Sequence, residues 1–433
     1  MECSTGTIRC RWYAAFLLVA AFALLGIAAR QANWRPLNLS DALVRLAFIT
    51  LISVAGRFPL HVSAKTKIVV DSSLIFASLL LFPSPWGPLV AGLGALMGHL
   101  LFWRVFLDAA INVSVVVLEG FCVQWAFLTL GGTIPAQFDR PSLLVPLVGA
   151  ALVTLVLERF LVALAVALYE ETRLDCVLSG SWKGELKEDV ALLLLGVLTA
   201  LVVQAQPYAL ILTVLPIVLV YFSLRNSLRL RALTVDAVES LADVIDRRDR
   251  YTAGHSLRVA DLAEKLAVEM GLPWQEVHTV RAAARVHDLG KIEMDANVLT
   301  RPGPLGKEGW DLMHRHPSAG AEIVVRFPEF AQGANYVRCH HERWDGKGYP
   351  RGLHGEEIPL GARIIAVADA YDAMLTDRPY RKALSLEMAL AEFQRGAGMQ
   401  WDEEPVGALL RIVSRDNSAA AEARVSAPLL TEV

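Results

Sequence analysis

Long runs of apolar residues fill the first half of the chain. They cover approximately residues 12–29, 41–60, 68–82, 85–102, 105–130, 142–168, 190–205 and 207–224. A helix needs about 20 residues to cross a bilayer, so the second and the sixth run are long enough, whereas the third and the last two are short. Prolines interrupt the neighbouring runs at positions 83, 85, 88 and 207. The pattern therefore predicts a helical membrane bundle over residues 1–224 with six, seven or eight spans.

Beyond residue 225 the pattern changes, because charged residues now mix with apolar ones at helical spacing. Gly- and Pro-containing loops separate the segments, and strand signals are nearly absent. The predicted helices are Val235–Arg250, His255–Met270, Gln275–Leu289, Gly306–Arg326, Ala331–Arg343, Pro359–Thr376 and Ser385–Arg395. The sequence thus predicts an all-α chain in which an all-helical soluble domain follows the membrane bundle. Residues 417–433, rich in Ala, Ser and Glu, are predicted to be disordered.

A linker helix over residues 225–250 is predicted to join the two halves. Its apolar side chains follow a 4-3 spacing that Arg231 interrupts once: Leu224, Leu228, Val235, Val238, Ala242 and Ile245. Such a seam is typical of a short coiled coil, through which two copies of the chain would form a homodimer. An amphipathic helix that packs on its own domain gives the same pattern. The spacing does not choose between these interpretations.

Composition and charge limit the classes of function and partner that are possible. The chain has 433 residues, 54% of them hydrophobic, and a net charge of −3. No block of basic residues interleaved with aromatic ones is present, so nucleic acid is excluded as a partner. Arg9 and Arg11 precede the first apolar run and small residues follow near Ala28, as in a signal peptide. Because further spans follow, we expect an uncleaved anchor and a lipid bilayer as partner.

The distribution of Lys and Arg predicts the orientation in the membrane. With eight spans and the N-terminus inside, twelve basic residues fall on cytoplasmic stretches and three on outer ones. The cytoplasmic positions are 9, 11, 57, 65, 67, 104, 173, 183, 187, 225, 229 and 231, and the outer ones are 30, 35 and 140. By the positive-inside rule, both termini and the soluble domain are predicted to lie in the cytoplasm.

Several ionisable residues lie inside or at the ends of the apolar runs: His99, Asp108, Glu119, Glu158 and Arg159. A charge in hydrocarbon costs on the order of 3 kcal/mol, so such side chains usually face the bundle interior and pair or bind something. They form either a sensor pocket or a structural Glu–Arg pair that orients helices. No ligand is indicated.

The five cysteines, at positions 3, 10, 122, 176 and 339, include no CxxC pair. They predict no disulfide framework, which fits a reduced cytosolic compartment for the soluble half. Cys339 stands beside His340, but we interpret it as a small buried hydrophobe rather than a zinc ligand.

Potential metal ligands are concentrated in the soluble half. His287 and Asp288 are consecutive, near the end of a predicted helix that Gly290 can close. A neutral imidazole gives one nitrogen to one metal, whereas a carboxylate can bridge two, so this pair suits a dinuclear centre. The other members of the set, all within about 115 residues, are His255, His316, His340, His341 and Asp369. The remaining histidines, at positions 278, 314 and 354, have polar neighbours and are predicted to be exposed.

This ligand set predicts a reaction at phosphorus. Nitrogen and oxygen ligands without thiolate suit iron or manganese. Two divalent ions about 4 Å apart would clamp the oxygens of an in-line displacement, so phosphodiester hydrolysis is the expected chemistry. Asp288 and Lys291 are the predicted catalytic residues, because the Lys291 ammonium can neutralise a phosphate oxygen. Arg378 and Arg381 either hold a second phosphate or base edge, or are solvated charges after a helix.

From about residue 236 to 416 the chain resembles the HD-GYP domain, a branch of the HD phosphohydrolase superfamily. The matching segments, in family order, are RDRYTAGHSLRVA, VHDLGKI, RPGPL, MHRHPSAGAEIV, HHERWDGKGYPRGLHGEEIPLGARIIAVADAYDAML and DRPYRKALS. The resemblance implies hydrolysis of the bacterial messenger cyclic di-GMP to linear pGpG, and often on to GMP. It therefore also implies the inner membrane of a bacterium. No comparable resemblance covers residues 1–224.

The resemblance implies roles for single residues. The seven ligands correspond to a di- or trinuclear centre, usually of iron or manganese. Because Tyr251 stands where trinuclear members carry a glutamate, we expect two divalent ions. Lys291 is expected at the scissile phosphate, and Asp372 is expected to support metal ligands. The expected substrate contacts are Asp249, Tyr349, Arg378 and Arg381, with the Tyr349 ring offering a stacking face to guanine.

Two further functions are consistent with these residues. One is hydrolysis of another cyclic dinucleotide, cyclic di-AMP or cyclic GMP-AMP. The other is a receptor or scaffold that binds the messenger or a diguanylate cyclase without cutting. A missing ligand would favour the receptor, and none is missing.

Overall fold

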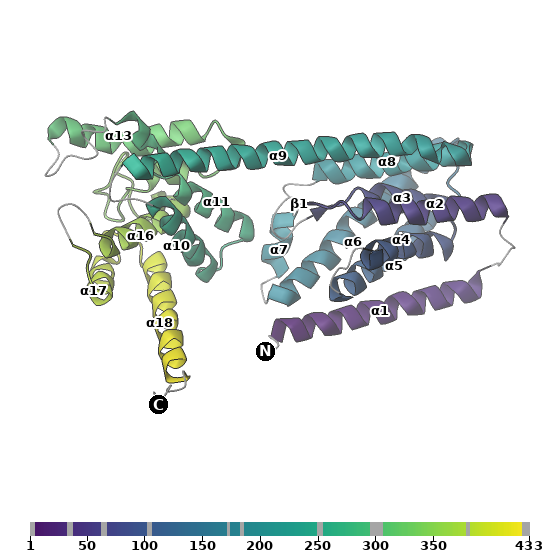
Figure 1. The fold of residues 1–433 in the computed structure, drawn as a ribbon, viewed down its shortest axis with the longest axis horizontal. Helices are drawn as coiled ribbons and strands as arrows, with labels where there is room; N and C mark the ends of the chain where they lie inside the picture. Colours follow the sequence, from purple (N-terminus) through teal and green to yellow (C-terminus); the bar gives the residue numbers. More distant parts are fainter. Residues whose placement is uncertain are drawn as a thin grey trace, which may run out of the picture. The chain divides into compact units, whose positions relative to one another are not determined.

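The computed structural model describes residues 5–32, 38–61, 67–101, 106–170, 174–181, 186–248, 254–294, 306–377 and 382–426. The chain divides into two compact units, Met1–Arg229 and Leu230–Val433. Both are helical, and the long helix α9 (Leu210–Arg248) runs through the division (Figure 1). The predicted all-α class is confirmed. The strands in the described part are β1 (Leu60–His61) and β2 (Lys67–Ile68), a short antiparallel pair.

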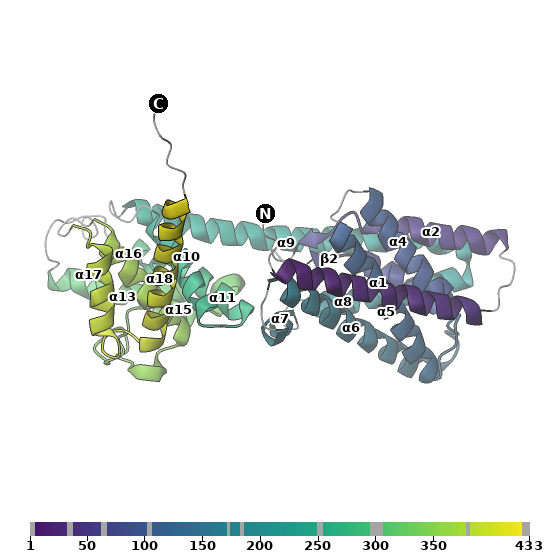
Figure 2. The same cartoon turned by 90° about the horizontal axis from the view of Figure 1, so that it is seen from below.

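Each of the eight apolar runs forms a helix in the first unit. Besides α9 these are α1 (Thr5–Gln31), α2 (Leu39–Ala55), α3 (Asp71–Leu81), α4 (Trp86–Leu101), α5 (Phe106–Thr129), α6 (Leu144–Glu170) and α8 (Leu186–Ala205). The shorter elements are η1 (Pro141–Leu143), α7 (Leu174–Ser181) and η2 (Pro207–Ala209). Helix α1 packs against α5 and α6, while α3 packs against α8 (Figures 1 and 2).

Four described helical segments are long and apolar enough to cross a membrane, judged by length and composition. They are Ile8–Gln31, Leu107–Thr129, Pro141–Tyr169 and Pro207–Arg248. This is fewer than the six to eight expected, because several apolar runs form shorter helices. Helix α2 has 17 residues and ends at Ala55, and α3 has 11 residues. At 1.5 Å per residue, α3 reaches about half-way through the hydrocarbon core.

The ionisable residues of the first unit include a pair between helices. Arg159 on α6 forms an ion pair with Asp189 on α8. This corresponds to the structural interpretation of Arg159, with an aspartate in place of the expected glutamate. Glu119 is also buried, whereas Asp108 and Glu158 are exposed.

The helices of the second unit follow the predicted order. They are α10 (His255–Glu269), α11 (Trp274–Arg285), η3 (Leu289–Glu293), α13 (Lys307–Val324), α14 (Pro328–Ala331), α15 (Ala334–Cys339), η4 (Gly355–Glu357), α16 (Leu360–Leu375), α17 (Leu386–Gly396) and α18 (Glu403–Ser426). Two predicted helices are too long, because α11 ends at Arg285 and α15 at Cys339. In both cases the helix is followed by a turn that contains histidines of the predicted ligand set.

Helix α18 was not predicted, and its last ten residues belong to the tail that was expected to be disordered. The segment 417–426 contains four alanines, which have the highest helix propensity of all residues. Residues 427–433 lie outside the described part.

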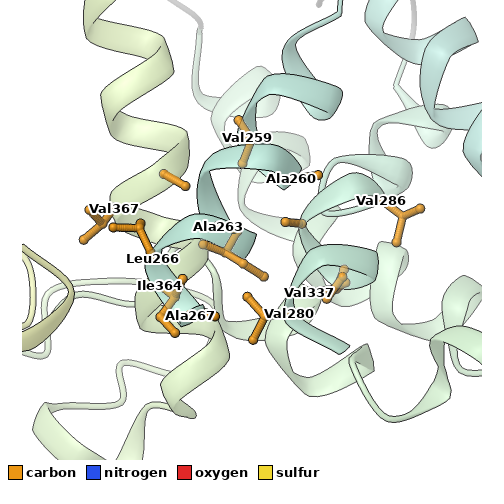
Figure 3. Close-up of a cluster of buried hydrophobic side chains, with 14 of the residues drawn as sticks. Val259, Ala260, Ala263, Leu266, Ala267, Val280, Val286, Val337, Ile364 and Val367 are labelled. Atoms are coloured by element: carbon orange, nitrogen blue, oxygen red, sulfur yellow. The ribbon is translucent and has the colours of Figure 1, made fainter. Parts of the chain in front are cut away.

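A buried apolar core holds the second unit together. Val259, Ala263 and Leu266 project from one face of α10 at helical spacing and are fully buried. Figure 3 shows them among side chains of α11, α15 and α16, such as Val280 and Ile364. Truncating a buried leucine such as Leu266 to alanine typically costs about 2–5 kcal/mol. The core therefore fixes, relative to one another, the helices that carry or adjoin the predicted ligands.

The apolar seam predicted on the linker helix faces inward. Val238, Ala242 and Ile245 are buried in the core of the second unit, and Val235 packs against it. Leu224 and Leu228 pack against the core of the first unit instead. The structure thus corresponds to the second interpretation, an amphipathic helix that packs on its own chain. Leu224, Leu228 and Val235 remain partly exposed, and the homodimer stays a prediction.

Candidate metal centre

His255 is the first residue of α10 and is buried. The helix begins there because Gly254 takes a left-handed conformation, with φ of 69°, that L side chains rarely adopt. Asp246 lies in the last turn of α9, and its carboxylate accepts hydrogen bonds from Ser256 N at 2.9 Å and Ser256 Oγ at 2.8 Å. The N-terminus of α10 is therefore held by the end of α9.

His287 and Asp288 lie in the turn between α11 and η3. Gly290 is needed here for close packing rather than to end a helix. A Cβ at Gly290 would meet the His316 carbonyl oxygen at 2.0 Å and Gly320 N at 2.5 Å. Because η3 approaches α13 this closely, Asp288 comes within reach of His316, and His316 Nε2 lies 3.3 Å from Asp288 Oδ1.

Three histidines are oriented by the same device. Their Nδ1 atoms bond to the backbone carbonyl three residues earlier: His287 to Ala284 at 2.7 Å, His316 to Met313 at 2.6 Å and His340 to Val337 at 2.6 Å. Such a bond fixes the tautomer that carries hydrogen on Nδ1 and leaves the Nε2 lone pair free. The Nε2 atoms then converge, and those of His316 and His340 are 3.4 Å apart.

The converging atoms form two groups that share one carboxylate. The first comprises Asp288, His316, His340 and His341, and the second His255, His287 and Asp288. Within each group the ligand atoms lie within 4.8 Å of one another. Two buried atoms, His287 Nε2 and Asp288 Oδ1, have no hydrogen-bond partner. An unpartnered imidazole nitrogen beside an unpartnered carboxylate oxygen fits a metal ion, so the cluster can hold one.

The remaining predicted ligand, Asp369 on α16, lies beside the second group. Its Oδ1 is 3.3 Å from His255 Nε2. One turn later on α16, Asp372 Oδ2 lies 2.7 Å from His255 Nδ1. Arg258 holds Asp372 with two bonds, from Nε at 2.6 Å and from Nη2 at 2.9 Å. A chain from Arg258 through Asp372 therefore orients the His255 ring.

The charges of His340, His341 and Asp288 suit a cation. Burial, together with neighbouring imidazoles, lowers the pKa of His340 well below its usual value and lowers the pKa of His341 to about 3. Both rings are therefore neutral, as metal ligands must be. Burial acts to raise the pKa of Asp288, but the Lys291 ammonium, with the adjacent histidine, outweighs it and lowers this pKa well below its usual value. Lys291 Nζ lies 2.5 Å from Asp288 Oδ2.

The glycine-rich turn after His341 brings Tyr349 to the cluster. Tyr349 N donates to the His341 carbonyl oxygen at 3.2 Å. The buried Glu342 carboxylate accepts hydrogen bonds from Arg351 N at 2.7 Å and Leu353 N at 3.1 Å, which closes the turn. A Cβ at Gly348 would meet Arg343 N at 2.3 Å, so only glycine fits there.

The phenol of Tyr349 lies near the acidic ligands. Burial and the carboxylates of Asp288 and Asp369 all raise its pKa. The hydroxyl is therefore protonated and can donate a hydrogen bond to an anion at the cluster.

Residues 239–404 match the family model of the HD domain. This segment is an HD domain of the HD-GYP type. It is 42% identical over 180 residues to the cyclic di-GMP phosphodiesterase response regulator RpfG of Xanthomonas campestris, covering 41% of this chain and 47% of that protein. Identity to a cyclic di-GMP phosphodiesterase of Thermotoga maritima is 39% over 179 residues, covering 41% and 49%. For the 3'3'-cGAMP-specific phosphodiesterase 3 of Vibrio cholerae it is 34% over 177 residues, covering 41% and 38%. The chain spans about half the length, or less, of these relatives.

The HD domain brings together all seven residues of the predicted ligand set. Of the expected substrate contacts, Tyr349 lies beside the cluster, whereas Asp249, Arg378 and Arg381 fall outside the described residues, as does Tyr251. Cys339 is buried against Ile358 and Ala362, as expected for a small hydrophobe.

The three other histidines are exposed, as predicted, but each has a neighbour that the sequence did not indicate. His354 Nδ1 lies 2.8 Å from Glu357 Oε2, and His278 contacts the ring of Trp274. His314 stacks on Tyr349 with ring centroids 4.2 Å apart.

Three residues of the HD domain were missed by the sequence analysis: Asp246, Arg258 and Glu342. All three act through another residue, by holding Ser256, Asp372 and the glycine-rich turn. The only local signal is that Arg258 stands one turn after His255 in HSLRVA. Their partners lie up to 114 residues away along the chain, so no spacing rule finds them.

Proposed function

We propose that the protein is a membrane-anchored, metal-dependent phosphodiesterase that hydrolyses cyclic di-GMP. The observation that carries the proposal is that Asp288 belongs to both groups of ligand atoms. A shared carboxylate is the arrangement that holds two cations side by side, which is the site required for an in-line displacement at phosphorus.

The residues of the HD domain would divide the work as follows. His316, His340 and His341 would hold one ion, His255, His287 and Asp369 the other, and Asp288 would bridge them. Divalent ions bound there, iron or manganese by the nitrogen and oxygen donor set, supply an acidified water and neutralise phosphate charge. Lys291, at the edge of Asp288, and the protonated hydroxyl of Tyr349 would bind phosphate oxygens and stabilise the charge that develops on them.

The reaction adds water across one phosphodiester bond. A new bond forms between phosphorus and the water oxygen, the bond to the 3'-oxygen breaks, and the leaving oxygen takes up a proton. The product is linear pGpG, and a second cut gives GMP. Asp249, Arg378 and Arg381 are proposed to contact the substrate, in line with the resemblance.

The names of the relatives support cyclic di-GMP as the substrate, and they also suggest a second candidate substrate. Two of the relatives are named as cyclic di-GMP phosphodiesterases, and another as specific for 3'3'-cGAMP. The second candidate function is therefore hydrolysis of 3'3'-cGAMP by the same centre.

Membrane anchoring rests on the outer faces of the first unit. On α1, Trp12, Phe16 and Phe22 are 75%, 68% and 71% exposed. Large exposed apolar patches of this kind mark a surface that contacts lipid or protein. The helix that carries them here is long enough to cross a bilayer, which supports lipid. We propose an inner-membrane location with the HD domain in the cytoplasm, following the distribution of basic residues.

Regulation by the membrane half is proposed to pass through α9. This helix contributes side chains to the cores of both units, and its end holds Ser256 beside His255. A displacement of α9 would therefore reach a metal ligand directly.

The test uses the full chain in detergent, loaded with Mn²⁺ or, anaerobically, Fe²⁺. It should convert cyclic di-GMP to pGpG or GMP, measured by chromatography, and Asp288→Ala should abolish conversion. Protein that holds metal and cleaves 3'3'-cGAMP but leaves cyclic di-GMP intact would establish the second function. Protein that binds the messenger and cuts nothing would be a receptor, and the proposal would be wrong.

A further inference from the structure

Four aromatic rings form a row that leads from the metal-ligand cluster to the surface of the HD domain. The ring centroids of His341 and Tyr349 lie 4.9 Å apart, and those of Tyr349 and His314 lie 4.2 Å apart. The row continues to Trp310, whose centroid is 5.7 Å from that of His314. The inner end belongs to the ligand cluster. The outer end is open, since Trp310 is 49% exposed.

His314 occupies one face of Tyr349. The two ring planes are 29° apart at a centroid distance of 4.2 Å, which is a stacked pair. That face of Tyr349 is therefore covered by His314, and the stacking of Tyr349 on guanine stays a prediction. The outer rings of the row, His314 and Trp310, are exposed and lie one turn apart on α13.

We propose that Trp310 and His314 form an outer subsite that stacks a purine base of the cyclic dinucleotide bound at the HD centre. The inference rests on the proposed function, because it assumes a nucleotide whose phosphate lies at the cluster. A phosphate near His341 and Tyr349 leaves its base to extend away from the ligands, along the row of rings. Aromatic side chains bind bases through their faces, so this subsite favours purines without reading one particular base edge.

Such a subsite acts on binding rather than on the chemical step. In this arrangement Trp310 and His314 do not reach the reacting phosphate, since Tyr349 lies between them and the ligand His341. Their loss should raise KM and leave kcat nearly unchanged. By the usual strength of base stacking, Trp310→Ala should raise KM for cyclic di-GMP by about 5- to 50-fold.

The chain offers a matched control on another helix. Trp274 and His278 are also one turn apart, on α11, with ring centroids 4.1 Å apart. Trp274→Ala and His278→Ala remove the same side chains from the same helical spacing outside the row. They should leave KM within about twofold.

The experiment compares Trp310→Ala, Trp310→Leu, Trp310→Phe and His314→Ala in the metal-loaded full chain. Each is tested on cyclic di-GMP and on bis(p-nitrophenyl) phosphate, a phosphodiester without a nucleobase. Trp310→Leu keeps an apolar side chain but has no ring, so it should behave like Trp310→Ala, whereas Trp310→Phe should retain most of the affinity. All variants should cleave the base-free ester like the wild type.

Three outcomes would overturn the subsite: an unchanged KM in Trp310→Ala, an equal loss on both substrates, or wild-type behaviour of Trp310→Leu. Failure of the proposed function looks different, because the wild type itself would then leave every cyclic dinucleotide intact. In that case the subsite is tested by comparing the equilibrium binding of cyclic di-GMP to the wild type and to Trp310→Leu. Equal affinity rejects the subsite, and weaker binding by the variant supports it.

Discussion

Asp246 on α9 holds Ser256 with two hydrogen bonds, at 2.9 Å to the backbone nitrogen and 2.8 Å to the hydroxyl. Ser256 follows His255 directly, so the end of α9 positions one of the proposed metal ligands. Asp246 itself is 2% exposed, and a buried carboxylate of this kind is costly unless hydrogen bonds satisfy it. The linker helix and the candidate metal centre are thus joined directly.

Replacing Asp246 with alanine should therefore weaken both stability and metal retention. The loss of two bonds to a charged group leaves Ser256 N–H buried without an acceptor, at a cost of about 1.5–3 kcal/mol. Thermal unfolding and the half-saturating Mn²⁺ concentration measure the two effects. Asp246→Asn is the control, because its amide can accept from the N–H and donate to the hydroxyl. If Asp246→Ala binds Mn²⁺ like the wild type, the coupling is absent.

Metal content should report the shared role of Asp288. His255→Ala should lose the ion of one group and His316→Ala the ion of the other, leaving about one per chain in each case, while Asp288→Ala should lose both. Elemental analysis of purified full-length protein provides the count. The exposed His354, paired with Glu357, supplies the control, and His354→Ala should match the wild type. An Asp288→Ala protein that still holds one tightly bound ion would contradict a bridging carboxylate.

Arg258 should tune the metal affinity although it touches no ligand. Without its two bonds Asp372 is free to turn, and His255 loses its fixed orientation. Loss of such a supporting partner typically costs 10- to 100-fold in metal affinity or activity. We expect about a tenfold weaker affinity in Arg258→Gln, measured by competition with a chelating dye.

The matched control for Arg258 is Arg281, which pairs with Asp261 at 3.1 Å and with Glu264 at 2.9 Å in the same unit. Exposed ion pairs contribute at most about 1 kcal/mol, so Arg281→Gln should leave metal affinity unchanged. Equal effects of both substitutions would mean that general charge, and not the bond to Asp372, is responsible.

Gly348→Ala should displace Tyr349. The new methyl group would overlap Arg343 N at 2.3 Å, and such overpacking typically costs about 1–3 kcal/mol. We expect a lower unfolding temperature and a loss of turnover on cyclic di-GMP at normal metal content. The comparison is Gly407→Ala on α18, where the nearest atom is the flexible Arg411 Nη1 at 3.4 Å. That change should be neutral or stabilising, since alanine is the better helix former.

Periodicity predicted most of the helices but not what their apolar faces contact. The seam from Leu224 to Ile245 has the spacing of a coiled coil, yet it packs into two cores of the same chain. Both arrangements bury the same stripe, so the sequence pattern is the same for each. Helix α18 was missed for a different reason: its alanine-rich end carries little amphipathic signal.

Gly290 was expected to matter for the structure, and it does, but for a different physical reason. Its neighbours in sequence indicated the end of a helix, whereas the structure requires glycine because α13 approaches it through Gly320. The contact joins residues thirty positions apart, and only the folded chain brings them together.

The sequence by itself determined the chemistry of this protein: five imidazoles and two carboxylates in family order, an all-helical frame and an apolar first half. These are properties of residue types and local spacing, which folding does not alter. The tertiary structure decided that the ligand atoms converge, that Asp288 serves both groups, and that one face of Tyr349 is covered by His314. Those features depend on distances between helices remote in sequence, and such distances are set by core packing.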